Sequence, residues 1–421
     1  MAKSSVISGF YKLPPKERLA IIKDFSNLTD DEVRLLEDTG SLSMDAADRM
    51  VENVIGVFSE PMGIGVNFQI NGKDYLIPMA TEEPSVIAAA SYAAKMIREG
   101  GGFHTSSTTP VMIGQIQVVK IRDIKTAKKQ VLDTRAEVLK KANDQDPVLN
   151  SFGGGAKDLD ARIIDTIMGQ MLIVELYVDC RDAMGANAVN TMAEAVAPMI
   201  EQLTGGHVYL RIISNLATKR LAKAWCAIPK EALGGEAVVD GIAYASAFAM
   251  ADPYRAATHN KGAMNGIIAV VLATGNDHRA IEAGAHAYAA INGQYTTLSK
   301  WTKNVKGNLE GVIELPMAVG LIGGAVKTHP IAKIAMKILN VKSANEFAEV
   351  LAAVGLAQNL GALRALANEG IQRGHMSLHA RNIAINAGAR DELIDLVAER
   401  MVKERKVRID RAKEILEELA K

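Results

Sequence analysis

Cysteine, aromatic residues and net charge are all scarce in this chain of 421 residues. The two cysteines, Cys180 and Cys226, are too few for a disulfide framework or a four-thiolate zinc site, and they fit a reducing compartment. Lysine plus arginine number 48, as do aspartate plus glutamate, so the broad positive field of a non-specific nucleic-acid binder is missing. Only 5% of residues are aromatic, which favours close-packed alanine and glycine helices over an aromatic-lined surface.

Long apolar runs are absent as well. The longest run lies between Gly266 and Gly275 and falls well short of the roughly 20 residues that a membrane span needs. The N-terminal segment 1–19 has no apolar stretch behind its basic residues, so we expect no secretory signal. We therefore expect a cytoplasmic protein of two or three domains that binds neither nucleic acid nor membrane.

Local signals predict a hairpin followed by a helix. Asn71-Gly72 lies between two strand patterns and predicts a type I′ turn, because both central residues of that turn take positive φ. An alanine-rich helix is predicted over Val86–Ile97, directly after the acidic pair Glu82-Glu83. Thr29–Glu32 has the pattern of a capping box at the start of an earlier helix. The acidic pair thus stands where a strand gives way to a helix, and side chains at such a junction often face a cleft.

Strand and helix signals alternate between Pro110 and Asn215. The predicted strands are Val111–Ile121, Met171–Val178 and Val208–Ile213, and the predicted helices are Ile124–Ala142 and Val189–Leu203. This β-α-β-α-β run indicates a compact, inserted α+β module of split-βαβ type. From Ala217 onward the chain is expected to be largely helical, and it ends in two charged amphipathic helices, Asp391–Arg405 and Ile409–Leu419.

Common nucleotide and metal motifs are missing. No G-x-G-x-x-G follows a strand and opens a helix, so a bound dinucleotide would lack the Rossmann fingerprint. No P-loop, H-E-x-x-H or C-x-x-C occurs, which disfavours nucleotide hydrolysis and zinc chemistry, and no metal is expected.

Polar clusters among small or apolar residues are the candidate sites. In Glu82–Ser85 an acid can be desolvated and held protonated as a general acid, although acids there more often only offset the helix dipole. Asp252–Gly262 is expected as a loop before an apolar helix, where Lys261 can stabilise an oxyanion and Arg255 can clamp a carboxylate. A plain solvated loop is the alternative.

Three more polar clusters lie further apart in the chain. Asp277 follows the apolar run, and its carboxylate meeting Lys261 would keep the ammonium charged. His375 follows Gly374 and can be a mobile proton donor, although lone histidines are more often structural. The small residues of Asp182–Asn187 let a ligand approach the backbone, and the helix expected near Val189 offers its N-terminus to phosphate. A simple turn is the alternative for that segment.

Six motifs together closely resemble the 3-hydroxy-3-methylglutaryl-coenzyme A (HMG-CoA) reductase family, in its soluble class II form. They are Glu52–Gly56, Glu83–Ser85, Asp182–Asn187, Thr258–Gly262, Thr274–Asp277 and Gly374–Met376, in the family's order and spacing. The resemblance implies an α+β fold whose large, mostly helical domain (1–109 and 216–374) binds HMG-CoA and forms the dimer. It also implies an inserted ferredoxin-like, non-Rossmann NAD(H) domain (110–215) and a small C-terminal helical flap (375–421).

The resemblance further implies a four-electron reduction of HMG-CoA to mevalonate and CoA with two NAD(P)H. Lys261 would stabilise the oxyanion at each hydride addition, and Glu83 would supply a proton to the aldehyde-stage oxygen. Asp277 would hydrogen-bond that pair and tune both pKa values. His375 would protonate the departing CoA thiolate, on a flap that opens between the two hydride transfers.

Binding residues follow from the same resemblance. The HMG portion would be bound by Ser85, Arg255, Asn265, Gln358 and Asn359. The cofactor would be bound by Asp146, Asp182, Met184, Gly185, Ala186 and Asn187. A carboxylate at Asp146 accepts from a free 2′-hydroxyl and repels a 2′-phosphate, so NADH is expected over NADPH unless a nearby arginine or lysine reverses the preference. The family implies a homodimer with active sites at its interface, in which dimers can associate further, for example as a trimer of dimers.

Two other classes of protein compete with the reductase. A non-redox CoA-thioester hydrolase or lyase can use Lys261 and Asp277 without any nicotinamide. A scaffold for partner proteins can use the charged terminal helices and leave the polar clusters structural. The direction of the reaction, towards mevalonate or away from it, does not follow from the residues.

Overall fold

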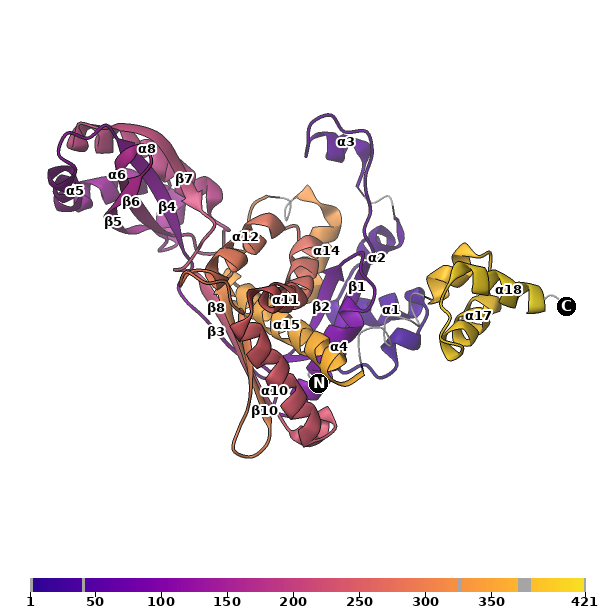
Figure 1. The fold of residues 1–421 in the computed structure, drawn as a ribbon. Helices are drawn as coiled ribbons and strands as arrows, with labels where there is room; N and C mark the ends of the chain where they lie inside the picture. The colour runs from indigo at the N-terminus through magenta and orange to yellow at the C-terminus, as the bar shows by residue number, and fades with distance from the viewer. Residues whose placement is uncertain (1–2, 40–41, 325–327, 370–379, 420–421) are drawn as a thin grey trace.

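The computed structural model describes residues 3–39, 42–324, 328–369 and 380–419 (Figure 1). Its N-terminal part consists of short elements: η1 (Phe10–Lys12), α1 (Pro15–Ser26), α2 (Asp30–Glu37) and α3 (Met44–Asp48). The capping box predicted at the start of α2 is confirmed. Glu32 N donates to Thr29 Oγ1 at 3.2 Å, and Thr29 N donates back to Glu32 Oε2 at 2.7 Å.

The predicted hairpin is also confirmed. Strands β1 (Met62–Ile70) and β2 (Lys73–Ala80) pair antiparallel around Asn71 and Gly72, whose φ values of 49° and 78° are both positive. Helix α4 (Val86–Arg98) follows β2 after a junction of a few residues and packs on β1. The junction 81–85 is therefore held between a strand and a helix that are both anchored in the core.

Three closely packed helices form the centre of the protein. They are α4, α11 (Pro253–Ala273) and α15 (Ala344–Arg364), which continues into the π-helical turn η2 (Ala365–Glu369). A Cβ added to Gly266 on α11 would lie 2.8 Å from Gln358 Cβ on α15, and one added to Gly361 would lie 3.1 Å from Ala89 on α4. Glycine at these contacts lets the helix axes approach closely, and this approach fixes where the polar ends of the helices meet.

Among the residues that the structure describes, one helix is long and apolar enough to cross a membrane by length and composition, over Ala344–Ala367. It covers α15 and the first residues of η2, and 67% of its apolar window is buried inside the protein. The burial is that of a core helix in a globular protein.

A four-stranded antiparallel sheet lies beside these helices, in the order β3-β8-β10-β9. Its strands are β3 (His104–Ser107), β8 (Leu221–Ile228), β9 (Ser299–Lys303) and β10 (Leu309–Pro316). The expectation of a largely helical chain after Ala217 missed β8, β9 and β10. In β8 the inward residues include Ala222, Ala224 and Cys226, small side chains with little strand propensity, so the alternating pattern was weak.

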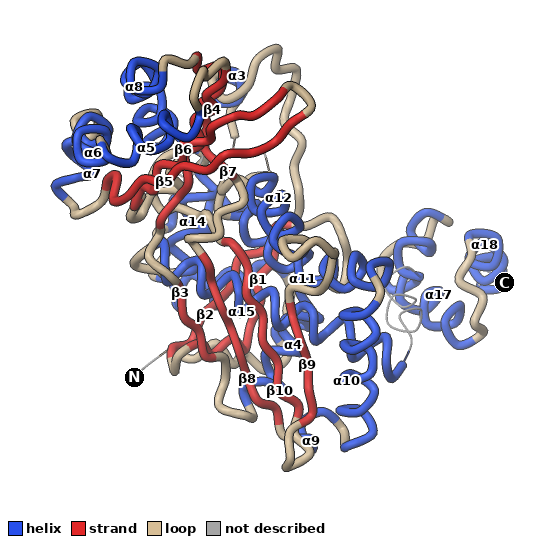
Figure 2. The backbone as a smooth tube through the Cα atoms, turned by 60° about the vertical axis from the view of Figure 1, so that its left-hand side comes forward, coloured by secondary structure: helices blue, strands red, loops and turns tan. Residues whose placement is uncertain are grey.

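Helices surround this sheet and the central bundle. They are α9 (Lys230–Leu233), α10 (Glu236–Ala251), α12 (His278–Ala289) and α14 (Pro330–Leu339). Figure 2 shows α9 and α10 at the same end of the molecule as the tips of β8, β9 and β10.

The second four-stranded antiparallel sheet has the order β5-β6-β4-β7. Its strands are β4 (Val111–Val119), β5 (Gly155–Thr166), β6 (Gly169–Asp179) and β7 (His207–Ser214), and helices α5 (Ile124–Asp133), α6 (Arg135–Asn143), α7 (Pro147–Ser151) and α8 (Ala186–Thr204) belong to the same region. Figure 1 shows this region projecting from the helical body on the side away from the C-terminal helices. The three strands expected in this region correspond to β4, β6 and β7, and the expected second helix corresponds to α8; all four are confirmed with shifted ends.

Two details of this region differ from the expectation. Strand β5 was missed, because its charged residues mask a short alternation of buried positions, as is common for an edge strand. The expected helix Ile124–Ala142 is divided in two at Thr134, whose Oγ1 donates to Gln130 O at 2.8 Å.

Helices α17 (Glu392–Lys403) and α18 (Ile409–Leu419) confirm the two predicted C-terminal helices. They form a small core of their own, with Val397, Met401 and Ile415 inside it. Figures 1 and 2 both show them at one edge of the molecule.

Candidate active site

A lysine and a glutamate from distant parts of the chain meet at the end of the central bundle. Lys261 Nζ on α11 donates to Glu83 Oε2, in the junction between β2 and α4, at 2.7 Å. Asn265 lies one turn further along α11, and its Nδ2 is 3.4 Å from the same carboxylate oxygen. The two ionic side chains are 59% and 34% exposed, so the pair is open to a ligand in this single chain.

Lys261 lies on a helix and not on the expected loop. Helix α11 begins at Pro253, and Asp252 caps it by accepting from Arg255 N at 2.8 Å. An aspartate cap followed by proline at the first helical position is a helix-start signal that the sequence contained. The helix gives Lys261 a more rigid support than a loop would, and a rigid support favours a preorganised ammonium group.

Ser85 is the residue before α4 and has a left-handed backbone with φ of 74°. This conformation is uncommon for a residue other than glycine and costs on the order of 1 kcal/mol or more. Its hydroxyl makes no hydrogen bond that caps the helix. Strained backbone beside Glu83 is typical of functional sites.

Asp277 does not join the Glu83–Lys261 pair in this structure. Its Oδ1 caps α12 by accepting from Ala280 N at 3.0 Å, and Arg279 Nε lies 4.0 Å away. Within the described ranges Asp277 forms no hydrogen bond to Lys261 or Glu83. His375 lies outside the described residues.

Two further predicted binding residues lie on the central helices. Arg255 on α11 is half-buried, and Gln358 on α15 is buried. Arg255 forms no ion pair with any residue that the structure describes, and its burial lowers the pKa of its guanidinium. Gln358 on α15 packs against Gly266, is 4% exposed and has a buried Oε1 without a partner among the described residues. Both therefore keep hydrogen-bonding capacity that the described chain does not use.

Asn359 lies inside a polar network that the sequence analysis did not anticipate. It is 1% exposed, and its Oδ1 accepts from Ser299 Oγ at 2.9 Å and from Trp301 Nε1 at 2.7 Å. Its Nδ2 donates to His259 O on α11 at 3.0 Å. In this geometry Asn359 ties α15, α11 and β9 together from within.

The network also fixes the protonation of His259. Trp301 Nε1 can only donate, which orients the Asn359 oxygen, and Ser299 must then donate to that oxygen as well. Ser299 Oγ consequently accepts from His259 Nε2, 2.7 Å away, and Nδ1 carries a lone pair without a partner in the described structure. Burial, followed by the Arg255 charge, lowers the pKa of His259 to about 4, so the ring is neutral.

Asp182–Asn187 connects β6 to α8, which begins at Ala186, three residues before the expected Val189. Gly185 precedes the helix with φ of 109°, and a Cβ there would lie 2.4 Å from Cys180 Sγ, so only glycine fits. The first N–H groups of α8 have no acceptor within the helix, and the helix dipole adds positive potential there. This end of α8 suits the phosphates of a dinucleotide.

Asp146 caps the short helix α7 and accepts from Leu149 N at 2.8 Å through Oδ1. It is partly exposed and forms no ion pair with the described residues. Its second carboxylate oxygen accepts no hydrogen bond from the described residues and can therefore accept one from a ligand.

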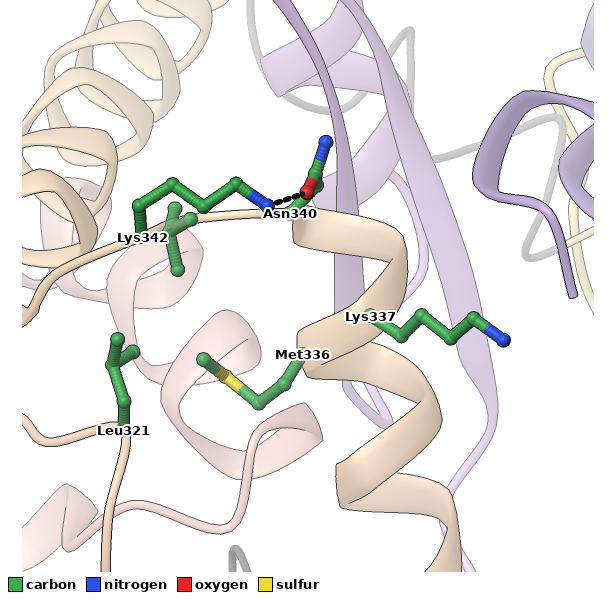
Figure 3. A pocket seen from close by; sticks show the side chains of 6 residues that line it. Leu321, Met336, Lys337, Asn340 and Lys342 are labelled. Atoms are coloured by element: carbon green, nitrogen blue, oxygen red, sulfur yellow. Dashed lines mark hydrogen bonds between the residues drawn. The ribbon is translucent and has the colours of Figure 1, made fainter.

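Two cavities lie in the described part of the chain, and neither is lined by Asp146 or by Asp182–Asn187. One of about 360 Å³ is lined by Leu321, Met336, Lys337, Asn340, Val341 and Lys342. In Figure 3 the Lys342 ammonium meets Asn340 Oδ1 and Lys337 points away, so neither amine faces the space. A second cavity, of about 420 Å³, lies between Pro84 and the C-terminal part, where Arg381 and Ile394 line it.

Comparison with known proteins identifies the family of the chain. The family described as hydroxymethylglutaryl-coenzyme A reductase matches residues 14–380. The 3-hydroxy-3-methylglutaryl-coenzyme A reductase of Archaeoglobus fulgidus is 62% identical over 418 residues, which are 99% of this chain and 95% of that protein.

Solved structures are similar over the whole chain. The HMG-CoA reductase of Streptococcus pneumoniae superposes with a TM-score of 0.84 at 41% identity, covering 98% of this chain and 99% of that one. A second structure of that class II enzyme, bound to NADPH in open conformations, gives 0.82 at 41% identity, with 97% and 100% covered.

The fold and these matches define an oxidoreductase that acts on a CoA thioester with a nicotinamide cofactor. The chain belongs to the hydroxymethylglutaryl-coenzyme A reductase family. Its activity is the reduction of HMG-CoA, and the hydrolase or lyase alternative is not favoured.

Proposed function

We propose that the Glu83–Lys261 pair is the reaction centre at which this chain converts HMG-CoA to mevalonate and CoA. The observation that carries the proposal is the 2.7 Å contact between Lys261 Nζ and Glu83 Oε2, from residues far apart in sequence. A bound nicotinamide cofactor supplies the hydride at each of the two reductions. All other steps fall to side chains of this protein.

Lys261 stabilises the oxygen of the reacting carbonyl. Hydride addition places negative charge on that oxygen, first at the thioester and then at the aldehyde, and a fixed ammonium lowers the energy of both transition states. The 2.7 Å hydrogen bond to Glu83 also lets a proton move between the two side chains. Glu83 thereby supplies the proton that the aldehyde-stage oxygen takes up.

Asp277 and His375 complete the proposed chemistry. Asp277 joins the pair through a local rearrangement that releases its cap on α12, and it then tunes the proton affinity of Glu83 and Lys261. His375 protonates the departing CoA thiolate, which makes it a better leaving group.

The HMG portion is held by side chains around this pair. Arg255, which lacks an ion-pair partner in the described chain, binds the substrate carboxylate, and Ser85, Asn265 and Gln358 donate or accept around it. Asn359 supports these side chains indirectly, because its hydrogen bond to His259 O holds α11 against α15.

The cofactor is bound by Asp146, Asp182, Met184, Gly185, Ala186 and Asn187. The N–H groups at the start of α8 face its phosphates, and the free oxygen of Asp146 accepts from the adenosine ribose. A carboxylate there repels a 2′-phosphate, so NADH is preferred over NADPH. Binding of NADPH by the similar S. pneumoniae enzyme shows that the fold also accepts the phosphorylated cofactor.

Residues 110–215 form a ferredoxin-like cofactor domain, residues 1–109 and 216–374 the large domain, and residues 375–421 the flap. The strand order β5-β6-β4-β7 and the separate core of α17 and α18 support this division. We further propose a cytoplasmic homodimer with the active site across its interface, which fits the exposure of Ile55 and Phe58 at 99% and 92%. Larger assemblies of such dimers are expected to have the same activity per site.

A single experiment tests the reaction centre and its dimer dependence. Turnover of HMG-CoA is measured with the wild-type chain and with Lys261→Met over a dilution series, with mass determined by light scattering. The proposal predicts turnover that falls as the wild type dissociates and near-zero turnover for Lys261→Met at every concentration. Full activity in the monomer would contradict the dimer, and full activity of Lys261→Met would contradict the reaction centre.

A further inference from the structure

Arg220 is a buried cation whose side-chain hydrogen bonds in the described structure all go to backbone carbonyls. It is 3% exposed, and its Nη1 donates to Ala183 O at 3.0 Å and to Met184 O at 2.9 Å. Its Nη2 donates to Val319 O at 2.6 Å. Burying a guanidinium without a direct ion pair is costly, and none is formed within the described chain, so the three carbonyls hold it in place, with the nearby charges of Asp179 and Asp182 favouring its protonated form.

The three carbonyls belong to two different regions. Ala183 and Met184 lie between β6 and α8, whereas Val319 follows β10 on the other four-stranded sheet. Arg220 itself stands just before β8, after the chain has left β7. A single side chain therefore joins the start of α8 to the body that carries Lys261.

Backbone contacts reinforce this junction. Leu321 N donates to Asp182 O at 2.8 Å, and Ala344 N donates to Asp182 Oδ1 at 2.8 Å. A Cβ on Gly320 would lie 2.5 Å from Met184 N, so the two segments are pressed together. Gly320 N also donates to Asn276 Oδ1 at 2.9 Å, which links the junction to the residue before Asp277.

Arg220 also sets the direction of a peptide group. Because the peptide is planar and trans, a Met184 carbonyl that faces Arg220 turns the N–H of Gly185 to the opposite side. That N–H forms no backbone hydrogen bond in the described structure and stands at the N-terminus of α8. The positive charge behind the carbonyl polarises the peptide and makes the N–H a stronger donor.

We propose that Arg220 is a positioning residue for the dinucleotide: it fixes the Ala183–Met184 backbone so that Gly185 N–H and the start of α8 are presented to the phosphates. The inference rests on the proposed function of Asp182–Asn187 as the cofactor segment. Arg220 touches neither substrate nor cofactor, and it acts through the backbone of that segment. Its loss therefore weakens cofactor binding and leaves HMG-CoA binding unchanged.

The test compares Arg220→Gln and Arg220→Lys in the full-length protein. NADH affinity is measured by nicotinamide fluorescence without substrate, and KM is measured for NADH and for HMG-CoA. We expect Arg220→Gln to weaken NADH binding about tenfold, since the neutral amide keeps none of the three charged hydrogen bonds, while KM for HMG-CoA changes less than about twofold. Arg220→Lys keeps the charge and is expected to restore part of the affinity. Arg162→Gln, which removes an exposed arginine paired with Glu175, is the matched control and is expected to bind NADH normally.

Gly185→Ala separates this inference from the function on which it rests. This change strains the segment directly, because a Cβ there meets Cys180 Sγ. If Gly185→Ala weakens NADH binding and Arg220→Gln does not, the inference is overturned and the cofactor segment stands. If neither change weakens NADH binding, the proposed cofactor segment is wrong and the inference falls with it. If Arg220→Gln does not fold, Arg220→Lys decides: a selective loss of NADH affinity supports the inference, and an equal loss of HMG-CoA affinity overturns it.

Discussion

Lys261 Nζ lies 2.7 Å from Glu83 Oε2, although 178 residues separate them in the sequence. The contact depends on glycines within the central bundle. Gly262 and Gly266 let α11 lie close to α15, and Gly361 lets α15 lie close to α4, whose preceding residues include Glu83. Small residues in the core thus determine the geometry of the charged pair at its surface.

Replacing Lys261 by methionine is expected to lower kcat at least about 100-fold, because an oxyanion donor of this kind contributes on the order of 100- to 1,000-fold to the rate. Binding of HMG-CoA, measured by calorimetry, should change little. Lys300→Met, which removes an exposed lysine on β9, is the control and should keep normal kcat. A Lys261→Met enzyme with kcat within threefold of wild type would refute the assigned role.

The two neighbouring acids of the junction should behave differently. Glu83→Gln keeps a hydrogen-bond acceptor for Lys261 but removes the transferable proton, so reduction of added mevaldehyde should fall by about 100-fold or more. Glu82 is exposed, and its side chain forms no hydrogen bond or ion pair with the described residues, so Glu82→Gln should react at the wild-type rate. Equal effects of the two changes would show that the ion pair has no specific part in the reaction.

Asp146 is expected to set the cofactor preference. Asp146→Asn retains the cap on α7 and removes the negative charge, so the ratio of kcat/KM for NADPH to that for NADH should rise by about tenfold. The exposed Asp144, which pairs with Lys140, provides the control Asp144→Asn, and its ratio should not change. An unchanged ratio in Asp146→Asn would mean that other residues select the cofactor.

His259 should make the fold sensitive to acid. Its pKa is lowered to about 4 in the folded protein against about 6.5 when unfolded, so the unfolded chain binds the proton more readily between these values. Its contribution is fully present above about pH 6.5 and is lost as the pH falls towards 4, by roughly 3 kcal/mol of unfolding free energy. Denaturant unfolding of wild type and His259→Gln at several pH values measures this. Parallel pH profiles for the two proteins would contradict the buried, neutral ring.

The sequence predicted correctly those elements that are determined by neighbouring residues. Asn71-Gly72, the Thr29–Glu32 capping box and the helix at Val86 all follow from turn, cap or propensity rules within a few residues. Strands β5 and β8 escaped prediction because one is a charged edge strand and the other buries mainly alanine, so their strand state depends on pairing with distant partners.

The residues of the candidate site also fall into those that the sequence predicted and those that only the structure shows. The residues Glu83 and Lys261 were identified from motifs that also identified the family, but the contact between them follows only from the packing of α11 and α4 against α15. No sequence signal pointed to Arg220, Ser299 or Trp301. Their hydrogen-bond partners are backbone groups or side chains far away in the sequence, so no local motif marks them. The free end of α8 was anticipated, whereas the arginine behind it was not.

The most direct test of the central claim is the stoichiometry of the reaction with purified protein and HMG-CoA. Nicotinamide absorbance and free thiol are followed together, once with NADH and once with NADPH. The account predicts two cofactor molecules oxidised for each CoA released, with faster turnover on NADH. Release of CoA without oxidation of cofactor would contradict the four-electron reduction, and faster turnover on NADPH would contradict the role of Asp146.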